Sequence, residues 1–484
     1  MPCDPASGPI MSAAITRRID LRASCCFAAL AGDFNPQHLD PVKARRLLFG
    51  GTVIHGIHLL LLGLDMALAA RPGGCALASL GAVFSAPVPT GSCVRIEIER
   101  AAGDAETILL MTGDRPAATI DVGWVDAVGP GRPHVPVLTF AAEAPVERTI
   151  GEVARMRGRI PLAVSSASLL TLFPNIAARL PRDQVAALLA TTRIVGMECP
   201  GLHSIFAALA LNFIAPGTDA APELHFEVTR TRPALRLCSM KVQGPGVAGT
   251  IEALFRPDVV NQPGISEIKA LVPPASFGGQ RILIAGGSRG LGEVSAKIAA
   301  SGGATVIIGY AHGRDDALRV AGEISQVGGS ASVMHLDVTA DIAAALSALP
   351  EPVSHLYYFA SPRIRPNNSG EFDCALVAHY STYYVQGLNQ LLSRLLDRWP
   401  SGVTLFNPST IYLDEPDQRF AEYAASKASS EALCHEYASS PGKALRVVVP
   451  RLPRLKTDQT NSLQDDRLSS ALDVLLRVLP RSSN

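Results

Sequence analysis

Hydrophobic and polar positions along the first quarter of the chain predict one helix followed by an antiparallel sheet. Residues 56–70 form an apolar run too long for a strand and read as a buried helix. Alternating patterns follow at 94–100, 107–113 and 117–125, each bounded by turn residues. We therefore expect strands at these three places.

A second block repeats that order. We expect a helix beginning near Leu202, and strands at 223–230, 235–242 and 248–255. A shift of 145 residues places Gly56-Ile57-His58 on Gly201-Leu202-His203, which indicates an internal duplication.

The third block alternates between strand and helix patterns, which is typical of a doubly wound parallel sheet. Its strand-like segments are RILIAGG, ATVIIGY, SVMHLDV, HLYYFAS, GVTLFNPS and LRVVVP. Pro/Gly-rich seams at 127–148 and 257–279 separate the blocks and are the expected linkers. The predicted domains are therefore 12–126, 149–257 and 279–458, with a C-terminal helix or tail at 459–484.

Composition narrows the classes of partner and compartment. The 484 residues contain 43 basic and 43 acidic side chains, so no net field attracts nucleic acid or an anionic membrane. The nine cysteines show no paired spacing, and no apolar run has the length of a membrane span. We expect a cytoplasmic protein with a small-molecule substrate and no metal, and a homo-oligomer is possible.

The segment AGDFNPQHLDPVKARRLLFGGTVIHGIHLL carries the first candidate chemistry. It resembles the MaoC-like (R)-specific enoyl-CoA hydratases over about residues 12–126. The matching residues are Asp33, Asn35, Pro36, His38, Phe49, His55 and Gly56. The resemblance implies a hot-dog fold, and with the second block a double hot-dog of two helix-plus-antiparallel-sheet repeats.

Adding water to a 2-enoyl thioester, or removing it, needs groups that exchange protons near neutral pH. A carboxylate and an imidazole, Asp33 and His38, can hold the water between them. By the resemblance, the backbone N–H of Gly56, at the start of the helix, stabilises the developing enolate oxygen. A serine that relatives often carry is missing. In its place the run from Leu59 to Leu64 is either an acyl-chain wall or simple core.

The second block lacks the dyad, because the 145-residue shift puts Ala178 and Asp183 at its positions. We expect this block not to catalyse, but to complete the sheet and shape the acyl pocket. Glu198, Cys199 and His203 are expected to have structural roles.

The third block contains a glycine-rich turn between a strand and a helix, a place where backbone N–H groups can hold a pyrophosphate. Its spacing, with Asp337 and Tyr423-x3-Lys427, resembles the short-chain dehydrogenase/reductase (SDR) family over about 280–458. The resemblance implies a Rossmann-type domain that holds a nicotinamide coenzyme. The coenzyme-binding residues expected are Gly286, Ser288, Arg289, Gly290, Leu291, Gly292, Tyr310, Asp337 and Lys427.

Tyr423 is the expected proton donor to a substrate carbonyl. Its ordinary pKa is about 10, so it needs the cation of Lys427, one helical turn away on the same face. The family's hydroxyl falls on Thr410 by spacing, with Ser409 beside it, and we favour Ser409 slightly.

The coenzyme is expected to be NADPH. The second strand ends in Gly309-Tyr310 without an acidic residue for the ribose, and Arg289 and Arg314 are close by.

Several positions depart from the SDR pattern. The family's Asn-Asn-Ala-Gly is Tyr358-Phe359-Ala360-Ser361 here, its helix asparagine is His379, and Pro453-Arg454 replaces Pro-Gly. A non-catalytic binding or scaffold module is therefore an alternative for this block.

The leading hypothesis joins both sites. The SDR-like block reduces a 3-oxoacyl thioester with NADPH, and the first block dehydrates the 3-hydroxyacyl product, or the reverse order runs. The substrate is carried on coenzyme A or an acyl carrier protein. Two alternatives stay open: a dehydratase only, or a reductase acting on a polyketide or sugar carbonyl.

Overall fold

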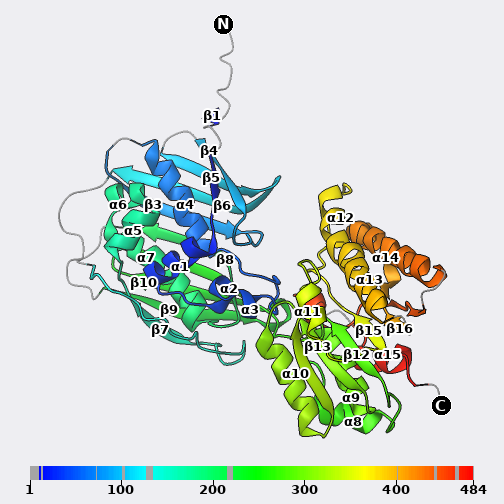
Figure 1. Cartoon of the computed structure of the whole chain (residues 1–484). Coiled ribbons are helices and arrows are strands. Elements are labelled where there is room, and N and C mark those ends of the chain that lie inside the picture. The colour runs from blue at the N-terminus through cyan, green and yellow to red at the C-terminus, as the bar shows by residue number, and fades with distance from the viewer. Residues whose placement is uncertain are drawn as a thin grey trace. The chain divides into compact units, whose positions relative to one another are not determined.

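The computed structural model divides into two compact units, Met1–Asp258 and Val259–Asn484 (Figure 1). It describes residues 10–11, 15–71, 73–100, 104–126, 135–214, 222–399, 402–440, 444–463 and 468–482. The first predicted seam lies partly outside these ranges. Among the described residues, no helix combines the length and the apolar character needed to cross a membrane.

The first unit is built on one antiparallel sheet of eleven strands, with the order β1-β4-β5-β6-β3-β8-β11-β10-β9-β7 and β2 paired to β4. Its strands are β1 (Ile10–Met11), β2 (Ile15–Arg18), β3 (Cys75–Phe84), β4 (Cys93–Arg100), β5 (Ala105–Thr112), β6 (Arg115–Asp126), β7 (Arg157–Pro161), β8 (Ser204–Phe213), β9 (Glu223–Arg232), β10 (Leu237–Gly244) and β11 (Val247–Phe255). All six strands predicted in these two blocks are present.

The order of this sheet is symmetrical about its centre. The central pair is β3 with β8, in which Gly81 faces Ala210. From there the sheet continues through β6, β5 and β4 on one side, and through β11, β10 and β9 on the other. Each half thus repeats the other in the same chain order.

Helices cover this sheet and pack on one another. They are α1 (Leu21–Ala31), α2 (Pro36–Leu39), α3 (Pro41–Ala44), α4 (Gly56–Ala69), α5 (Ser166–Leu172), α6 (Pro174–Arg179) and α7 (Arg182–Arg193), with short turns at η1 (Ile194–Glu198) and η2 (Pro233–Leu235). α4 and α7 are buried along nearly their whole length. Apolar residues occur on all faces of α4, whereas α7 also buries polar side chains such as Gln184 and Thr192. Asp65 of α4 accepts hydrogen bonds from the N–H groups of Asn175 and Ile176 and so caps α6.

The helix predicted near Leu202 is wrong. Strand β8 begins at Ser204, and the helix of the second half is α7, which ends well before it. A turn with a positive φ at Gly201 separates α7 and η1 from that strand. The apolar residues after this turn form a strand, and the helix of this half lies before it, where no helix was predicted.

The single shift of 145 residues is therefore wrong as well. It holds at the start, because α5 begins at 166 and α1 at 21, but α7 begins only 126 residues after α4, at 182 against 56. The second half is shorter in the segment where the first half carries Asp33, His38 and α2. This explains why Ala178 and Asp183 fall on α6 and α7.

The second unit is a six-stranded parallel sheet with the order β14-β13-β12-β15-β16-β18, and the parallel sheet predicted from the alternation is confirmed. Its strands are β12 (Arg281–Ala285), β13 (Thr305–Tyr310), β14 (Ser330–His335), β15 (His355–Tyr358), β16 (Val403–Phe406) and β18 (Leu445–Val448), and the short β17 (Ser409–Thr410) and β19 (Arg451–Leu452) pair separately.

Two hydrophobic clusters cover the two faces of this sheet. The helices are α8 (Ile265–Leu271), α9 (Gly290–Ser301), α10 (Arg314–Gln326), α11 (Ala343–Ser347), α12 (Cys374–Ser381), α13 (Leu388–Arg398), α14 (Ala421–Ser439) and α15 (Ala471–Val478), with turns η3 (Thr382–Gly387), η4 (Ile411–Leu413), η5 (Gln418–Phe420) and η6 (Asp458–Thr460). The strand order reverses beside β12, which directs ligands to the carboxyl ends of β12 and its neighbours.

Candidate active sites

Asp33 lies where α1 ends and the chain turns toward the centre of the first unit. The turn depends on Gly32, whose φ of 73° favours glycine. A Cβ at Gly32 would also lie 2.8 Å from the ring of Phe140 and 3.0 Å from Cδ of Arg193. The Asp33 side chain that follows is 1% exposed.

His38 is placed by the short helix α2, which Asn35 caps by accepting a hydrogen bond from the N–H of Gln37. Nδ1 of His38 lies 2.7 Å from the carbonyl oxygen of Val53. A carbonyl only accepts, so we assign the proton to Nδ1, which leaves Nε2 with a lone pair. Burial lowers the pKa of His38 and favours this neutral form.

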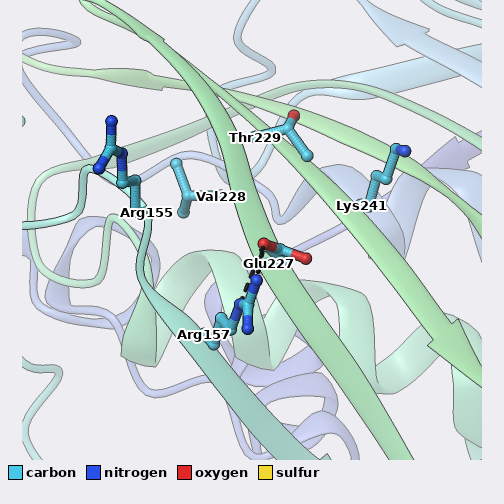
Figure 2. A pocket seen from close by; sticks show the side chains of 6 residues that line it. All are labelled: Arg155, Arg157, Glu227, Val228, Thr229 and Lys241. Atoms are coloured by element: carbon cyan, nitrogen blue, oxygen red, sulfur yellow. Dashed lines mark hydrogen bonds and ion pairs between the residues drawn. The ribbon is translucent and has the colours of Figure 1, made fainter.

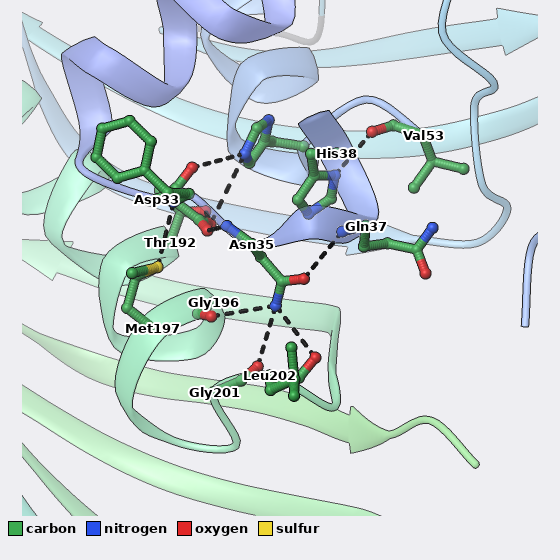
Figure 3. Close-up of polar contacts among 12 residues, drawn as sticks. Asp33, Asn35, Gln37, His38, Val53, Thr192, Gly196, Met197, Gly201 and Leu202 are labelled. Atoms are coloured by element: carbon green, nitrogen blue, oxygen red, sulfur yellow. Dashed lines mark hydrogen bonds and ion pairs between the residues drawn. The ribbon is translucent and has the colours of Figure 1, made fainter. Parts of the chain in front are cut away.

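Hydrogen bonds from both halves of the unit fix the Asp33 carboxylate. The hydroxyl of Thr192, on α7, donates to Oδ2 at 2.7 Å, and the backbone N–H of Asn35 donates to Oδ1 at 3.2 Å (Figure 3). A Cβ at Gly196 would lie 2.3 Å from both carboxylate oxygens, so only glycine fits beneath Asp33. Burial raises the pKa of Asp33, while the electrostatic interaction with His38 and the hydrogen bond from Thr192 oppose the rise.

Asn35 binds the loop of Asp33 and His38 to the same turn. Its Nδ2 lies 3.1 Å from the carbonyl oxygens of Gly196 and Gly201 and 3.2 Å from that of Leu202. The loop that carries Asp33 and His38 is therefore held by residues that follow it by more than 150 positions.

His55 lies against both members of the dyad. Its ring stacks on that of His38 with centroids 3.8 Å apart, and its Nε2 lies 3.2 Å from the backbone oxygen of Asp33. Burial holds the pKa of His55 well below its usual range, so the ring is neutral.

One ligand atom each of Asp33, His38 and His55 lies within 4.8 Å of the others, a spacing that a metal ion could use. However, the contact of His55 Nε2 with a carbonyl assigns a proton to that nitrogen, which removes it as a ligand.

Gly56 is the first residue of α4, as expected for a helix-end amide donor. A Cβ there would lie 3.1 Å from the ring of Phe84, so a larger residue would fit only if that ring shifted. The leucines from Leu59 to Leu64 belong to the hydrophobic core cluster or pack against it.

In the second unit, the glycine-rich turn connects β12 to α9, and at Gly286 and Gly292 it has room only for glycine. Gly286 has a φ of 80°, and a Cβ there would lie 2.8 Å from the backbone of Phe359. A Cβ at Gly292 would lie 2.2 Å from the carbonyl oxygen of Gly286. Such a turn at a helix start lets a phosphate approach the backbone, so these residues fit a dinucleotide.

The other predicted coenzyme residues lie around this turn or at the ends of neighbouring strands. Ser288 is buried and Leu291 packs against the hydrophobic cluster. Tyr310 ends β13 against the ring of His335, and Asp337 accepts hydrogen bonds from Thr339. Arg289 is paired to Asp458, with 3.3 Å between Nη1 and Oδ2.

Tyr423 and Lys427 lie on α14, one turn apart as predicted. Burial raises the pKa of Tyr423, and a hydrogen bond with the side chain of Thr410 opposes the rise. Burial lowers the pKa of Lys427 to about 8. Its Nζ lies 4.6 Å from the ring centre of Tyr384, a cation–π contact.

One expectation for this site needs correction. Thr410, not the slightly favoured Ser409, contacts Tyr423, whereas the Ser409 side chain interacts with Glu431. His379, which stands where the family has its helix asparagine, is exposed, and Tyr384 of the following helical segment contacts Tyr423.

A cavity of about 600 Å³ lies apart from all these residues, on β7, β9 and β10 of the first unit (Figure 2). Arg155, Arg157, Glu227, Val228, Thr229 and Lys241 line it. Arg157 is paired with Glu227 at 2.6 Å. No residue predicted to catalyse lies there.

The comparisons with known proteins bear on the first of the two sites. A family model described as "MaoC like domain" matches residues 11–113. An (R)-specific enoyl-CoA hydratase from Aeromonas caviae is 32% identical over 109 residues, which are 22% of this chain and 75% of that protein. The chain belongs to the MaoC-like family. Asp33, His38 and Gly56 of this MaoC-like protein all lie inside the matched region.

Solved structures similar to part of the MaoC-like protein include two reductases from Brucella melitensis. A 3-ketoacyl-(acyl-carrier-protein) reductase complexed with NADH is 27% identical, with a TM-score of 0.36, and the match covers 41% of this chain and 88% of that one. A 3-oxoacyl-[acyl-carrier protein] reductase with bound NAD is 19% identical, with a TM-score of 0.38, and the match covers 46% and 91%.

Three residues at the two candidate sites were not predicted from the sequence: Thr192, Tyr384 and Asp458. Thr192 and Asp458 reach their partners across 159 and 169 positions, so no local pattern marks them. Tyr384 stands in a Tyr-rich helical segment, and that clustering was the available signal.

Proposed function

We propose that the first unit is a double hot-dog hydratase/dehydratase that adds water to 2-enoyl thioesters or removes it from 3-hydroxyacyl thioesters. The observation that carries this proposal is the convergence of Asp33 and His38, which offer ligand atoms within 4.8 Å of each other, together with the Nδ1 contact to Val53 that leaves His38 Nε2 able to accept a proton. The second half acts as a non-catalytic partner that holds Asp33 through Thr192.

In the hydration direction, the dyad binds one water between the carboxylate and Nε2. The water oxygen bonds to the β carbon, one of its protons passes to the dyad, and the dyad returns a proton to the α carbon. The N–H of Gly56 donates to the thioester oxygen as negative charge develops there. Dehydration follows the same steps in reverse.

The test measures hydration of a 2-enoyl thioester through the loss of the absorbance of its double bond. Asp33→Asn and His38→Gln should each lower kcat by at least about a hundredfold, the typical size of a general acid/base contribution. Activity of Asp33→Asn within a few-fold of wild type would refute the lyase assignment.

For the second unit we propose a short-chain reductase that acts on 3-oxoacyl thioesters, which makes the whole chain bifunctional. The coenzyme, NADPH, supplies a hydride when bound. Gly286, Ser288, Gly290, Leu291 and Gly292 would hold its phosphates. Tyr423 donates the proton to the carbonyl oxygen, Thr410 orients that hydroxyl, and the charge of Lys427 lowers the cost of proton release.

Two active sites on one chain make chemical sense because the product of the reductase is the substrate of the dehydratase. Coenzyme A or an acyl carrier protein would present the acyl group. We also propose that the protein is cytoplasmic, with domains at 12–126, 149–257 and 279–458 and a C-terminal tail at 459–484.

A second candidate for the reductase-like unit is a binding or scaffold module without turnover. One contact favours it. The Lys427 ammonium group lies over the Tyr384 ring, whereas the family pattern expects this group to hold the coenzyme ribose. Oxidation of NADPH by a 3-oxoacyl thioester, abolished by Tyr423→Phe, supports the reductase. Coenzyme binding without oxidation on any thioester supports the module.

A further inference from the structure

A short segment near the C-terminus lies over the glycine-rich turn. It consists of Thr457 and η6 (Asp458–Thr460), and we call it the strap. The strap closes on itself, because the N–H of Thr457 donates to Oγ1 of Thr460 at 3.0 Å and the N–H of Gln459 donates to Oγ1 of Thr457 at 3.3 Å. It is therefore a formed turn and not an irregular tail.

One side of the strap faces the turn that is expected to hold the coenzyme phosphates. Oδ2 of Asp458 lies 3.3 Å from Nη1 of Arg289, and Asp458 is only 4% exposed. A Cβ at Gly290 would lie 3.9 Å from the side chain of Thr457. The Asp458 carboxylate thus lies beside the Arg289 guanidinium at the N-terminus of α9.

The other side of the strap is bound to the loop after β15. Nη1 of Arg363 donates to the backbone oxygen of Asp458 at 2.7 Å. The side chain of Gln459 accepts from the N–H of Ile364 at 3.2 Å and donates to Oγ of Ser361 at 3.3 Å. The strap bridges the two loops between which a dinucleotide would lie.

A carboxylate and a phosphate bind a guanidinium through the same charge-assisted hydrogen bonds, and they repel each other. Both therefore compete for Arg289. We infer that Asp458 is an internal competitor of the coenzyme phosphates, so that the coenzyme binds only when the strap releases Arg289. This inference rests on the proposed coenzyme site and names the residue that sets its affinity.

The first test measures the dissociation constants of NADPH and NADH for the full chain by fluorescence. Asp458→Asn removes the competing charge and should tighten NADPH binding roughly tenfold. Asp397→Asn, an exposed position on α13, is the control and should bind like wild type. Unchanged or weaker NADPH binding by Asp458→Asn overturns the inference.

A second test follows the strap itself by hydrogen exchange. Adding NADPH to the wild-type chain should speed amide exchange at residues 457–460, because the coenzyme displaces them, whereas slower exchange contradicts displacement. If neither wild type nor Asp458→Asn binds either coenzyme, the proposed coenzyme site itself is wrong. If both bind equally, that site stands and only the competition fails.

Discussion

Thr192 donates a hydrogen bond to Oδ2 of Asp33 at 2.7 Å, although 159 positions separate the two residues. The bond joins the two halves of the first unit at its proposed catalytic carboxylate. The half without a dyad thus contributes to the site by fixing the orientation and the pKa of Asp33.

Replacing Thr192 by Val keeps the shape of the side chain and removes this bond. Because the bond opposes the rise in the pKa of Asp33, its loss should raise that pKa further. The acid limb of the kcat/KM profile for hydration should move to higher pH, and kcat should fall roughly tenfold.

Thr191→Val is the matched control, since that hydroxyl donates to the Leu188 carbonyl oxygen within the same helix. A profile for Thr192→Val that overlays the control at all pH values would mean that Thr192 has only a packing role.

Asn35 should contribute to the stability of the first unit through its three carbonyl partners. Asn35→Ala should lower the free energy of unfolding by about 3 kcal/mol, because buried carbonyls lose their donor. Asn35→Ser keeps a helix-capping oxygen but lacks the amide, so it should lose nearly as much. Denaturant unfolding measures both, and full stability of the serine variant would show that only the cap matters.

Lys297 should stabilise the second unit as the centre of a buried ionic network. It is 1% exposed, and its Nζ lies 2.8 Å from Glu293 and 2.7 Å from Glu323. Lys297→Met leaves both carboxylates short of a partner and should cost about 3 kcal/mol in chemical unfolding. Lys269→Met, at an exposed lysine, should cost less than about 0.5 kcal/mol; equal losses would argue against the network.

Lys427 should make the stability of the coenzyme-free second unit depend on pH. Burial lowers its pKa to about 8, against about 10.4 in an unfolded chain. Between these values the unfolded chain binds the proton that the folded chain has released, so the free energy of unfolding rises with pH. Below about pH 8 both states are protonated and the dependence ends.

Unfolding at several pH values between about 7 and 10, compared with Lys427→Met, isolates this contribution. The difference between the two proteins should grow in favour of wild type by up to about 1.4 kcal/mol per pH unit. If the difference in the free energy of unfolding did not change with pH, the Lys427 ammonium group would be solvated in the folded chain.

The sequence predicted the dyad, the glycine-rich turn and the Tyr423–Lys427 pair because each lies within one short segment. It did not predict α7. The helix of the second half was expected after Gly201, where strand β8 in fact begins. It favoured Ser409 over Thr410, a choice that depends on which way a two-residue strand faces. Contacts such as Thr192 with Asp33, or Arg289 with Asp458, arise only when distant segments fold together.

The most direct test of the whole account follows one 3-oxoacyl thioester through both sites by mass spectrometry, with NADPH present. Wild type should oxidise NADPH and form both the 3-hydroxyacyl and the 2-enoyl thioester. Asp33→Asn should oxidise NADPH at the same rate and stop at the 3-hydroxyacyl thioester. Enoyl product from Asp33→Asn at the wild-type rate would contradict the account.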